Sequence, residues 1–173
     1  MFKLDSEQDL VETFRPRDRS HLRAHPATVP REVKYPLFVR DYFSWTDPSG
    51  FHAYVVFNVG KGAPTGIAFR RAQGGGEPVA HMCDWCHSFG TSNTIGLMTT
   101  DMGSKKRVGV NLCLDLNCRA RVNETADLRG QNGVEASRKL LERIGRFAQE
   151  ALGIDLSGDD RDSDRPPRTL AND

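Results

Sequence analysis

The four cysteines of this chain fall into two close pairs. Two residues separate Cys83 from Cys86, four separate Cys113 from Cys118, and 26 residues lie between the pairs. Thiolates at such spacings can reach a single ion, and two pairs complete the tetrahedral, all-sulfur ligand set that a structural zinc prefers. The spacing therefore predicts one structural zinc ion bound by Cys83, Cys86, Cys113 and Cys118.

The longer spacer of the second pair indicates where a helix begins. A C-x4-C pair suits a short helix in which Cys113 precedes the first turn and Cys118 lies within it. A cysteine knuckle, a hairpin and then such a helix make up a treble-clef zinc finger. We therefore expect the helix N-terminus to help hold the metal, since its free N–H groups favour thiolate charge.

Other roles for the cysteines explain fewer of them. Cys83 to His87 form a literal C-x-x-C-H, the attachment motif of c-type haem, but haem attachment normally follows export and the N-terminal sequence has no apolar signal segment. A redox C-x-x-C would need a strand-to-helix context, whereas a glycine-rich stretch precedes this pair. The remaining alternative is a set of unrelated buried cysteines.

Catalysis at this metal is not expected. The H-x-E and P-C-x-x-C motifs of zinc deaminases are absent from the sequence. Four sulfur ligands also leave no position for an activated water. No nucleophile, base and orienting group can be assembled from neighbouring residues, so we expect the protein not to be an enzyme.

The elements around the cysteines predict an α+β domain. Residues 39–45, 51–59 and 65–71 alternate with turns rich in glycine and proline, which indicates an antiparallel β meander. Residues 93–100 and 106–112 predict a second hairpin that brings the cysteine pairs together.

Residues 133–152 predict a C-terminal amphipathic helix that packs on the sheet. Its apolar stripe comprises Val134, Leu140 or Leu141, Ile144, Phe147 or Ala148, and Ala151. The opposite face, which includes Arg138 and Arg143, is expected to be solvated.

The segments outside residues 35–152 look less structured. We expect a short helix within residues 5–14 and then, up to residue 34, a basic connector with no core. Residues 73–78 suggest a flexible linker and residues 153–173 a disordered acidic tail. The predicted organisation is therefore 1–34, 35–152 and 153–173.

Composition limits the classes of protein that fit. The 173 residues carry a net charge of +1, and only 38% are hydrophobic. The near-neutral charge argues against a general nucleic-acid coat, and no apolar run approaches the length of a membrane span. Without a signal segment we expect a cytoplasmic protein with reduced cysteines and no membrane partner.

The cysteine motifs and two further stretches resemble a known family. Cys83-x-x-Cys86-His87, Ile95-Gly96-Leu97-Met98-Thr99 and Cys113-x4-Cys118, together with the aromatic run Tyr42 to Pro48, are similar to the C-terminal treble-clef zinc-finger domain of the FusB-like proteins, also labelled fibronectin-binding proteins. The resemblance covers about residues 35 to 152. It implies a bacterial, translation-related protein that binds elongation factor G and influences its release from the ribosome.

One departure from the family limits what the resemblance implies. Resistance members of the family carry an N-terminal helical bundle, and only about 34 residues precede the first expected strand here. Fusidic acid resistance is therefore not implied.

We expect a partner-binding surface around the finger. It comprises Trp85, Lys105, Lys106, Arg107, Arg119 and Arg121. Trp85 is either an exposed anchor or a cap on the small core under the finger. The same cations would also fit ribosomal RNA phosphates, so a ribosome- or RNA-binding zinc finger is the alternative function.

Overall fold

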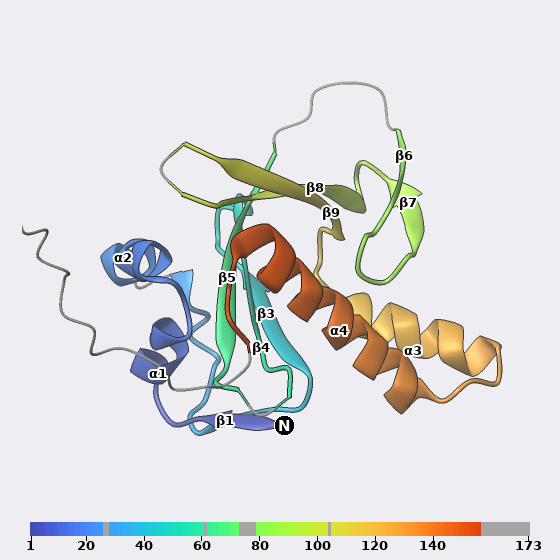
Figure 1. Cartoon of the computed structure of the whole chain (residues 1–173), viewed down its shortest axis with the longest axis horizontal. Helices are drawn as coiled ribbons and strands as arrows, with labels where there is room; N and C mark the ends of the chain where they lie inside the picture. Colours follow the sequence, from blue (N-terminus) through green and yellow to red (C-terminus); the bar gives the residue numbers. More distant parts are fainter. Residues whose placement is uncertain (26–27, 61, 73–78, 104, 157–173) are drawn as a thin grey trace, which may run out of the picture.

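The computed structural model describes residues 1–25, 28–60, 62–72, 79–103 and 105–156 (Figure 1). The expected linker at 73–78 and most of the expected acidic tail lie outside these residues. In chain order the described elements are β1 (Phe2–Leu4), α1 (Glu7–Glu12), α2 (Pro16–Ala24), β2 (Leu37–Val39), β3 (Tyr42–Thr46), β4 (His52–Phe57), β5 (Thr65–Arg71), β6 (Ala80–Met82), β7 (Phe89–Thr91), β8 (Ile95–Asp101), β9 (Arg107–Cys113), α3 (Cys118–Leu128) and α4 (Gly133–Leu152).

The central sheet is antiparallel, with strand order β3-β4-β5-β8-β9. β3, β4 and β5 form the predicted meander, and the first turn ends at Gly50, whose φ of 72° suits glycine. β8 pairs with the end of β5 through Arg70 and Arg71, which joins the predicted second hairpin to the meander. The predicted α+β class with an antiparallel meander is confirmed.

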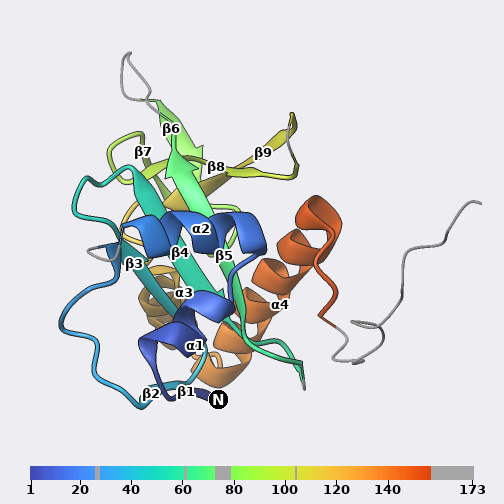
Figure 2. The same cartoon turned by 90° about the vertical axis from the view of Figure 1, so that its left-hand side faces the viewer.

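Strand β4 is covered on both faces. Ala53, Val55 and Phe57 pack into one hydrophobic cluster, and Tyr54 and Val56 into another. Figure 2 shows α1 and α2 on one side of the meander and α4 on the other. Successive side chains of a strand point to opposite faces, so β4 serves both layers.

The layer under α1 and α2 is rich in aromatic rings. Phe14 is fully buried and lies edge-on to Trp45 and Tyr54, with both ring centroids 5.9 Å away. Its ring lies directly on Gly66, where an added Cβ would come within 2.6 Å of the ring. Gly66 N–H also donates to the Thr13 carbonyl at 2.8 Å, so this glycine allows α1 to dock on β5.

The other layer contains α3 and α4. Leu140, Ile144 and Ala148 of α4 are buried against the sheet, which confirms most of the predicted stripe. The prediction that Val134 belongs to this stripe is wrong, since Val134 is 63% exposed in the first turn of α4. Asn132 accepts from Val134 N–H at the start of α4, and Gly153 ends the helix at φ 64°.

The N-terminal region is more ordered than the sequence predicts. The prediction that residues 15–34 lack a core is wrong, since they contain α2 and bury Leu22, Thr28 and Val29. Proline at the first helical position favours this start. Leu22 is the one buried residue of this arginine-rich helix, so α2 has no apolar stripe of its own. Packing of Leu22 on the aromatic layer beneath it therefore determines the position of α2.

Two strand pairs were not predicted. β1 pairs with β2, and β6 pairs with β7 on either side of the first cysteine pair. The single strand expected at 39–45 is therefore divided between β2 and β3, which belong to different sheets. None of the described helices has an apolar stretch long enough to cross a membrane.

Candidate metal centre and docking surface

The fold brings the four cysteines together from three segments. Cys83 and Cys86 lie in the turn between β6 and β7, Cys113 is the last residue of β9, and Cys118 is the first residue of α3. All four Sγ atoms lie within 4.8 Å of one another, with Cys83 to Cys118 at 3.7 Å and Cys86 to Cys113 at 3.5 Å. A tetrahedral zinc with Zn–S bonds of about 2.3 Å needs sulfurs about 3.8 Å apart, so the donors fit this ion.

Both cysteine pairs are closed by a residue with left-handed backbone. His87 has φ 61° and its N–H donates to the Cys83 carbonyl at 2.8 Å, whereas Leu116 has φ 54° and donates to the Cys113 carbonyl at 3.0 Å. This conformation is costly for residues other than glycine and persists only when surrounding contacts fix it. These two turns direct the sulfur atoms of both cysteine pairs toward the same metal site.

The ligand sulfurs are shielded from water. Cys83, Cys113 and Cys118 are buried and Cys86 is half-buried. The four sulfurs interact strongly: the hydrogen bond with the Cys113 sulfur is the main cause that lowers the pKa of Cys83 to about 7 and also lowers the pKa of Cys86, whereas the same contacts and burial raise the pKa values of Cys113 and Cys118. Thiolates are the form that binds zinc, and four of them leave no position open for water. Among the described residues this is the one cluster able to hold a metal ion.

Two contacts tie the first cysteine pair to the rest of the domain. Asp84 donates through its N–H to the Asn111 carbonyl at 2.8 Å, and its carboxylate accepts from Asn111 N–H at 2.7 Å. Arg143 of α4 donates to the Trp85 carbonyl at 2.6 Å. Arg143 is therefore not the solvated residue that the sequence predicts.

Tyr42 of β3 bonds to the backbone on either side of Cys118, in the second cysteine pair. Its hydroxyl donates to the Leu116 carbonyl at 2.6 Å and accepts from Arg119 N–H at 3.1 Å. Burial raises the pKa of Tyr42, so the phenol keeps its proton for this bond. The first turn of α3 is thereby fixed against the sheet beside the metal site.

Trp85 is part of the core. It is 2% exposed, and its ring packs edge-on to Phe69 and Phe147 at centroid distances of 5.8 and 6.4 Å. Its place among the candidate partner-binding residues is therefore wrong, and the alternative that it caps the core under the finger is correct. The contact with Phe147 involves α4, which lies 62 residues further along the chain, so local sequence does not reveal it.

The five candidate cations do not form one patch. Lys105, Lys106 and Arg107 lie at the hairpin tip before β9, whereas Arg119 and Arg121 lie on α3. The seven residues of β9 span about 20 Å between the two groups. Three of the cations are ion-paired: Arg107 with Asp101 at 2.8 Å, Arg119 with Asp41 at 2.9 Å and Arg121 with Asp115 at 2.8 Å.

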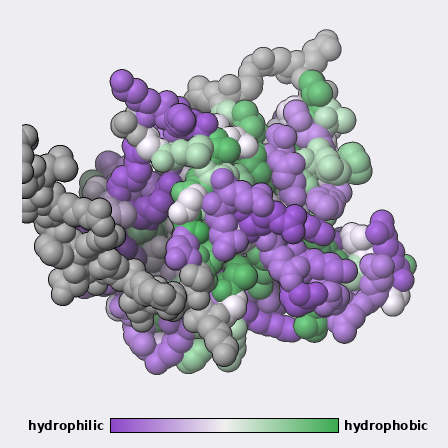
Figure 3. All heavy atoms as spheres, in the orientation of Figure 1, coloured by the Kyte–Doolittle hydropathy of each residue, from purple (hydrophilic) through white to green (hydrophobic). Residues whose placement is uncertain are grey.

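The β6–β7 hairpin carries an exposed apolar patch that the sequence does not predict. Phe89 is 80% exposed and lies directly opposite Met82, which is 43% exposed, and Val79 beside β6 is 58% exposed. Figure 3 shows hydrophobic spheres over this hairpin. Phe89 lies three residues after Cys86 and is the first residue of β7, which has only three residues. A large apolar residue so close to a zinc ligand, in a strand this short, is the sequence feature that could have indicated the patch.

A groove of about 760 Å³ adjoins this patch. Its walls are the first cysteine pair with Phe89 on one side and α3 and α4 on the other, including Val122, Ala126 and Lys139. The groove is therefore bordered by apolar and charged groups that the zinc site positions.

Four clustered cysteines, one at a helix start and two in a knuckle, define a treble-clef zinc protein. A family model described as "FBP C-terminal treble-clef zinc-finger" matches residues 17–154, so the chain belongs to this family and holds one structural zinc. The predicted family is confirmed, and the match begins 18 residues before the predicted limit at residue 35 because it includes α2.

A solved structure of the fusidic acid resistance protein FusC is similar to this chain with a TM-score of 0.46 and 16% sequence identity. The similarity covers 75% of this chain and 56% of the FusC chain, so this chain spans little more than half of that protein. No curated protein matches the chain.

Proposed function

We propose that this protein is a zinc-stabilised binding module that docks on elongation factor G and acts without catalysis. Membership of the zinc-finger family and the resemblance to its elongation factor G-binding members support this partner. The observation that carries the proposal is the exposed Phe89 and Met82 pair on a hairpin joined by two zinc ligands.

The metal makes this hairpin a suitable docking element. β6 and β7 are three residues each, too short to be stable as an isolated hairpin. Zinc binding at Cys83 and Cys86 and the Asp84 contact with Asn111 hold the turn between them. A surface fixed before binding loses little conformational entropy on association, and an aromatic anchor can then supply much of the binding energy.

The charged rim fits a protein partner better than RNA. Arg107, Arg119 and Arg121 are already paired with carboxylates, so each would have to break an ion pair to contact phosphate. Lys105 and Lys106 alone are few for phosphate-dominated binding. We therefore favour a protein partner over ribosomal RNA.

The test is calorimetric titration of zinc-loaded protein into elongation factor G with Phe89→Ala. Removing a central aromatic anchor should weaken binding by about 2 kcal/mol, or roughly 30-fold, while zinc content stays at one per chain. Phe38→Ala is the matched control, since Phe38 is 62% exposed on β2, away from the finger, and should leave the affinity unchanged.

Three results would contradict the proposal. The parent protein could show no binding to elongation factor G, or Phe89→Ala and Phe38→Ala could weaken it equally. Alternatively, a fall in affinity of several powers of ten between low and high salt would indicate that charge pairs, rather than the Phe89 anchor, dominate binding.

A further inference from the structure

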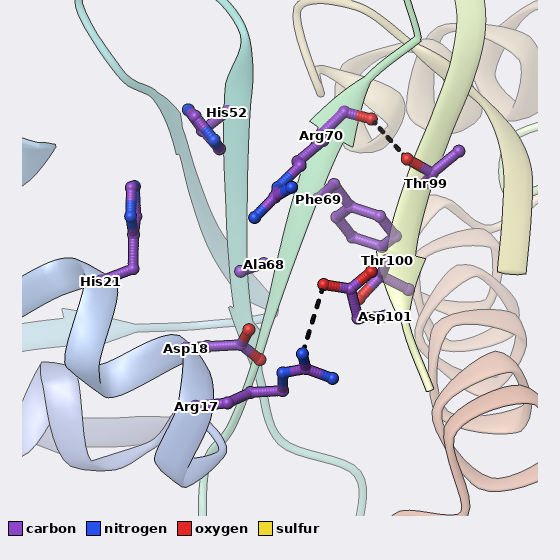
Figure 4. A pocket seen from close by; sticks show the side chains of 10 residues that line it. All are labelled: Arg17, Asp18, His21, His52, Ala68, Phe69, Arg70, Thr99, Thr100 and Asp101. Carbon is purple, nitrogen blue, oxygen red and sulfur yellow. Dashed lines mark hydrogen bonds and ion pairs between the residues drawn. The ribbon is translucent and has the colours of Figure 1, made fainter. Parts of the chain in front are cut away.

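A cavity of about 220 Å³ lies on the α2 side of the sheet, away from the metal (Figure 4). Arg17, Asp18 and His21 of α2 form one wall. The facing wall comes from three neighbouring strands, where His52 of β4 is paired with Arg70 of β5, and Arg70 with Thr99 of β8. Paired residues in antiparallel strands point to the same face, so these side chains converge.

Arg70 lines this cavity as a cation near Asp101, and it forms no ion pair with another described residue. Within the part of the chain that the structure describes, its guanidinium has no ion pair or hydrogen bond. Figure 4 shows it pointing into the cavity, between the imidazoles and Asp101. The His21 ring lies 4.9 Å from that of His52, which also lines the cavity, and 4.8 Å from that of His25.

The nearby carboxylates are already bonded to other cations. Asp18 accepts from Arg15 Nε at 3.0 Å, Asp101 accepts from Arg107 Nε at 2.8 Å and lies 3.7 Å from Arg17. Asp47 contacts His52 Nδ1 at 3.0 Å, which leaves His52 Nε2 for another partner. Because these carboxylates are already paired, the Arg70 guanidinium and the imidazoles remain available to bind an anion.

The titration of His21 agrees with a positive potential in the cavity. Burial is the first cause that lowers its pKa, and the charges of His52, His25 and Arg70 lower it further. A bound anion would reverse this effect and favour the protonated ring.

The two ends of the cavity differ. Figure 4 shows His21, His52 and the Arg70 guanidinium toward one end, and Asp18, Arg17 and Asp101 toward the other. Carboxylate oxygens accept hydrogen bonds from hydroxyl groups. The volume is below the range usual for drug-sized ligands, so the occupant is small.

We propose that this cavity binds a small sugar phosphate, with Arg70, His21 and His52 around the phosphate and Asp18 and Asp101 accepting hydrogen bonds from the sugar hydroxyls. Arginine suits this role because its fork of N–H groups can bind two phosphate oxygens at once. The site is on the face opposite α4 and does not depend on the proposed docking to elongation factor G.

A bound phosphate would raise the lowered pKa of His21, so this ring would take up a proton on binding, and binding should tighten as the pH falls from about 8 to about 6.5. The charged and titratable groups that line the cavity are Arg17, Asp18 and His21 from α2, His52 with Asp47 behind it, Arg70 from β5 and Asp101 from β8, and His25, just after α2, packs on His21.

The experiment is titration of the zinc-loaded full chain with ribose 5-phosphate, inorganic phosphate and ribose, followed by NMR or calorimetry. Ribose 5-phosphate should bind more tightly than inorganic phosphate, and ribose should not bind measurably. Arg70→Gln should weaken ribose 5-phosphate binding by about tenfold or more. Arg71→Gln is the matched control, since Arg71 is the next residue of β5 and points to the other face.

Several results would overturn the proposal. No binding of ribose 5-phosphate at millimolar concentration would remove the site, and equal losses in Arg70→Gln and Arg71→Gln would remove the role of Arg70. Equal affinities for inorganic phosphate and ribose 5-phosphate would refute the sugar contacts. Unchanged thermal unfolding of both variants is the check that each still folds.

Discussion

The two faces of the central sheet are held together in different ways. Under α1 and α2, the rings of Phe14, Trp45 and Tyr54 pack within 6 Å of one another. On the α3 and α4 face, the short strands β6 and β7 and the start of α3 are joined through four cysteines. The metal therefore replaces apolar burial where the elements are too short to supply it.

The difference also separates the two candidate sites. The exposed Phe89 hairpin belongs to the zinc-bound face, whereas the Arg70 cavity lies over the aromatic face. Strand β4 contributes side chains to both layers, so the faces share a scaffold although their sites are distinct. Breaking each face in turn tests how far that separation holds.

Removing a zinc ligand should have the largest effect. Cys113→Ser takes away one of four donors, and zinc sites of this type contribute about 10 kcal/mol or more of folding free energy, comparable to the whole stability of a domain. We expect the variant to lose zinc and cooperative unfolding, as measured by metal analysis and urea denaturation followed by circular dichroism.

Chelation of the parent provides the control for this variant. Metal removal should reproduce the loss, and added zinc should restore the chelated parent but not Cys113→Ser. A variant that remains as stable as the parent without bound metal would contradict the role given to zinc.

The aromatic face should respond without loss of metal. Phe14→Ala removes a fully buried ring that contacts Trp45, Tyr54 and Gly66, and such truncations cost about 3–5 kcal/mol. The urea midpoint should fall accordingly, while the folded protein still holds one zinc per chain. If folded Phe14→Ala binds less than one zinc, the two faces are not independent.

Local patterns predicted the parts of the fold that depend on neighbouring residues. The cysteine spacings located the metal site, and the apolar run of β4 and the three- and four-residue spacings of α4 located both elements. Each of these signals lies within one segment, which is why one sequence sufficed to find it.

Contacts between distant segments could not be predicted. Trp85 is buried by Phe69 and Phe147, and Arg143 bonds to its carbonyl across 58 residues. The approach of His21 to His52 likewise depends on how α2 lies on the sheet. Burial of Leu22 has the same origin, because a single apolar residue gives no periodic pattern.

Tyr42→Phe should have the smallest effect and is the sharpest probe of how the sheet supports the metal. It removes one hydroxyl that bonds to Leu116 and Arg119 beside the ligands, with little change in volume. Leaving the buried Leu116 carbonyl unpaired should cost about 1–2 kcal/mol. Because contacts behind metal ligands tune affinity, zinc binding measured by competition with a chelator should weaken by about tenfold.

Tyr35→Phe is the matched control, since the Tyr35 hydroxyl has no hydrogen-bond partner among the described residues and lies on the aromatic face. Equal zinc affinity in both variants would show that the first turn of α3 is held by the cysteines alone.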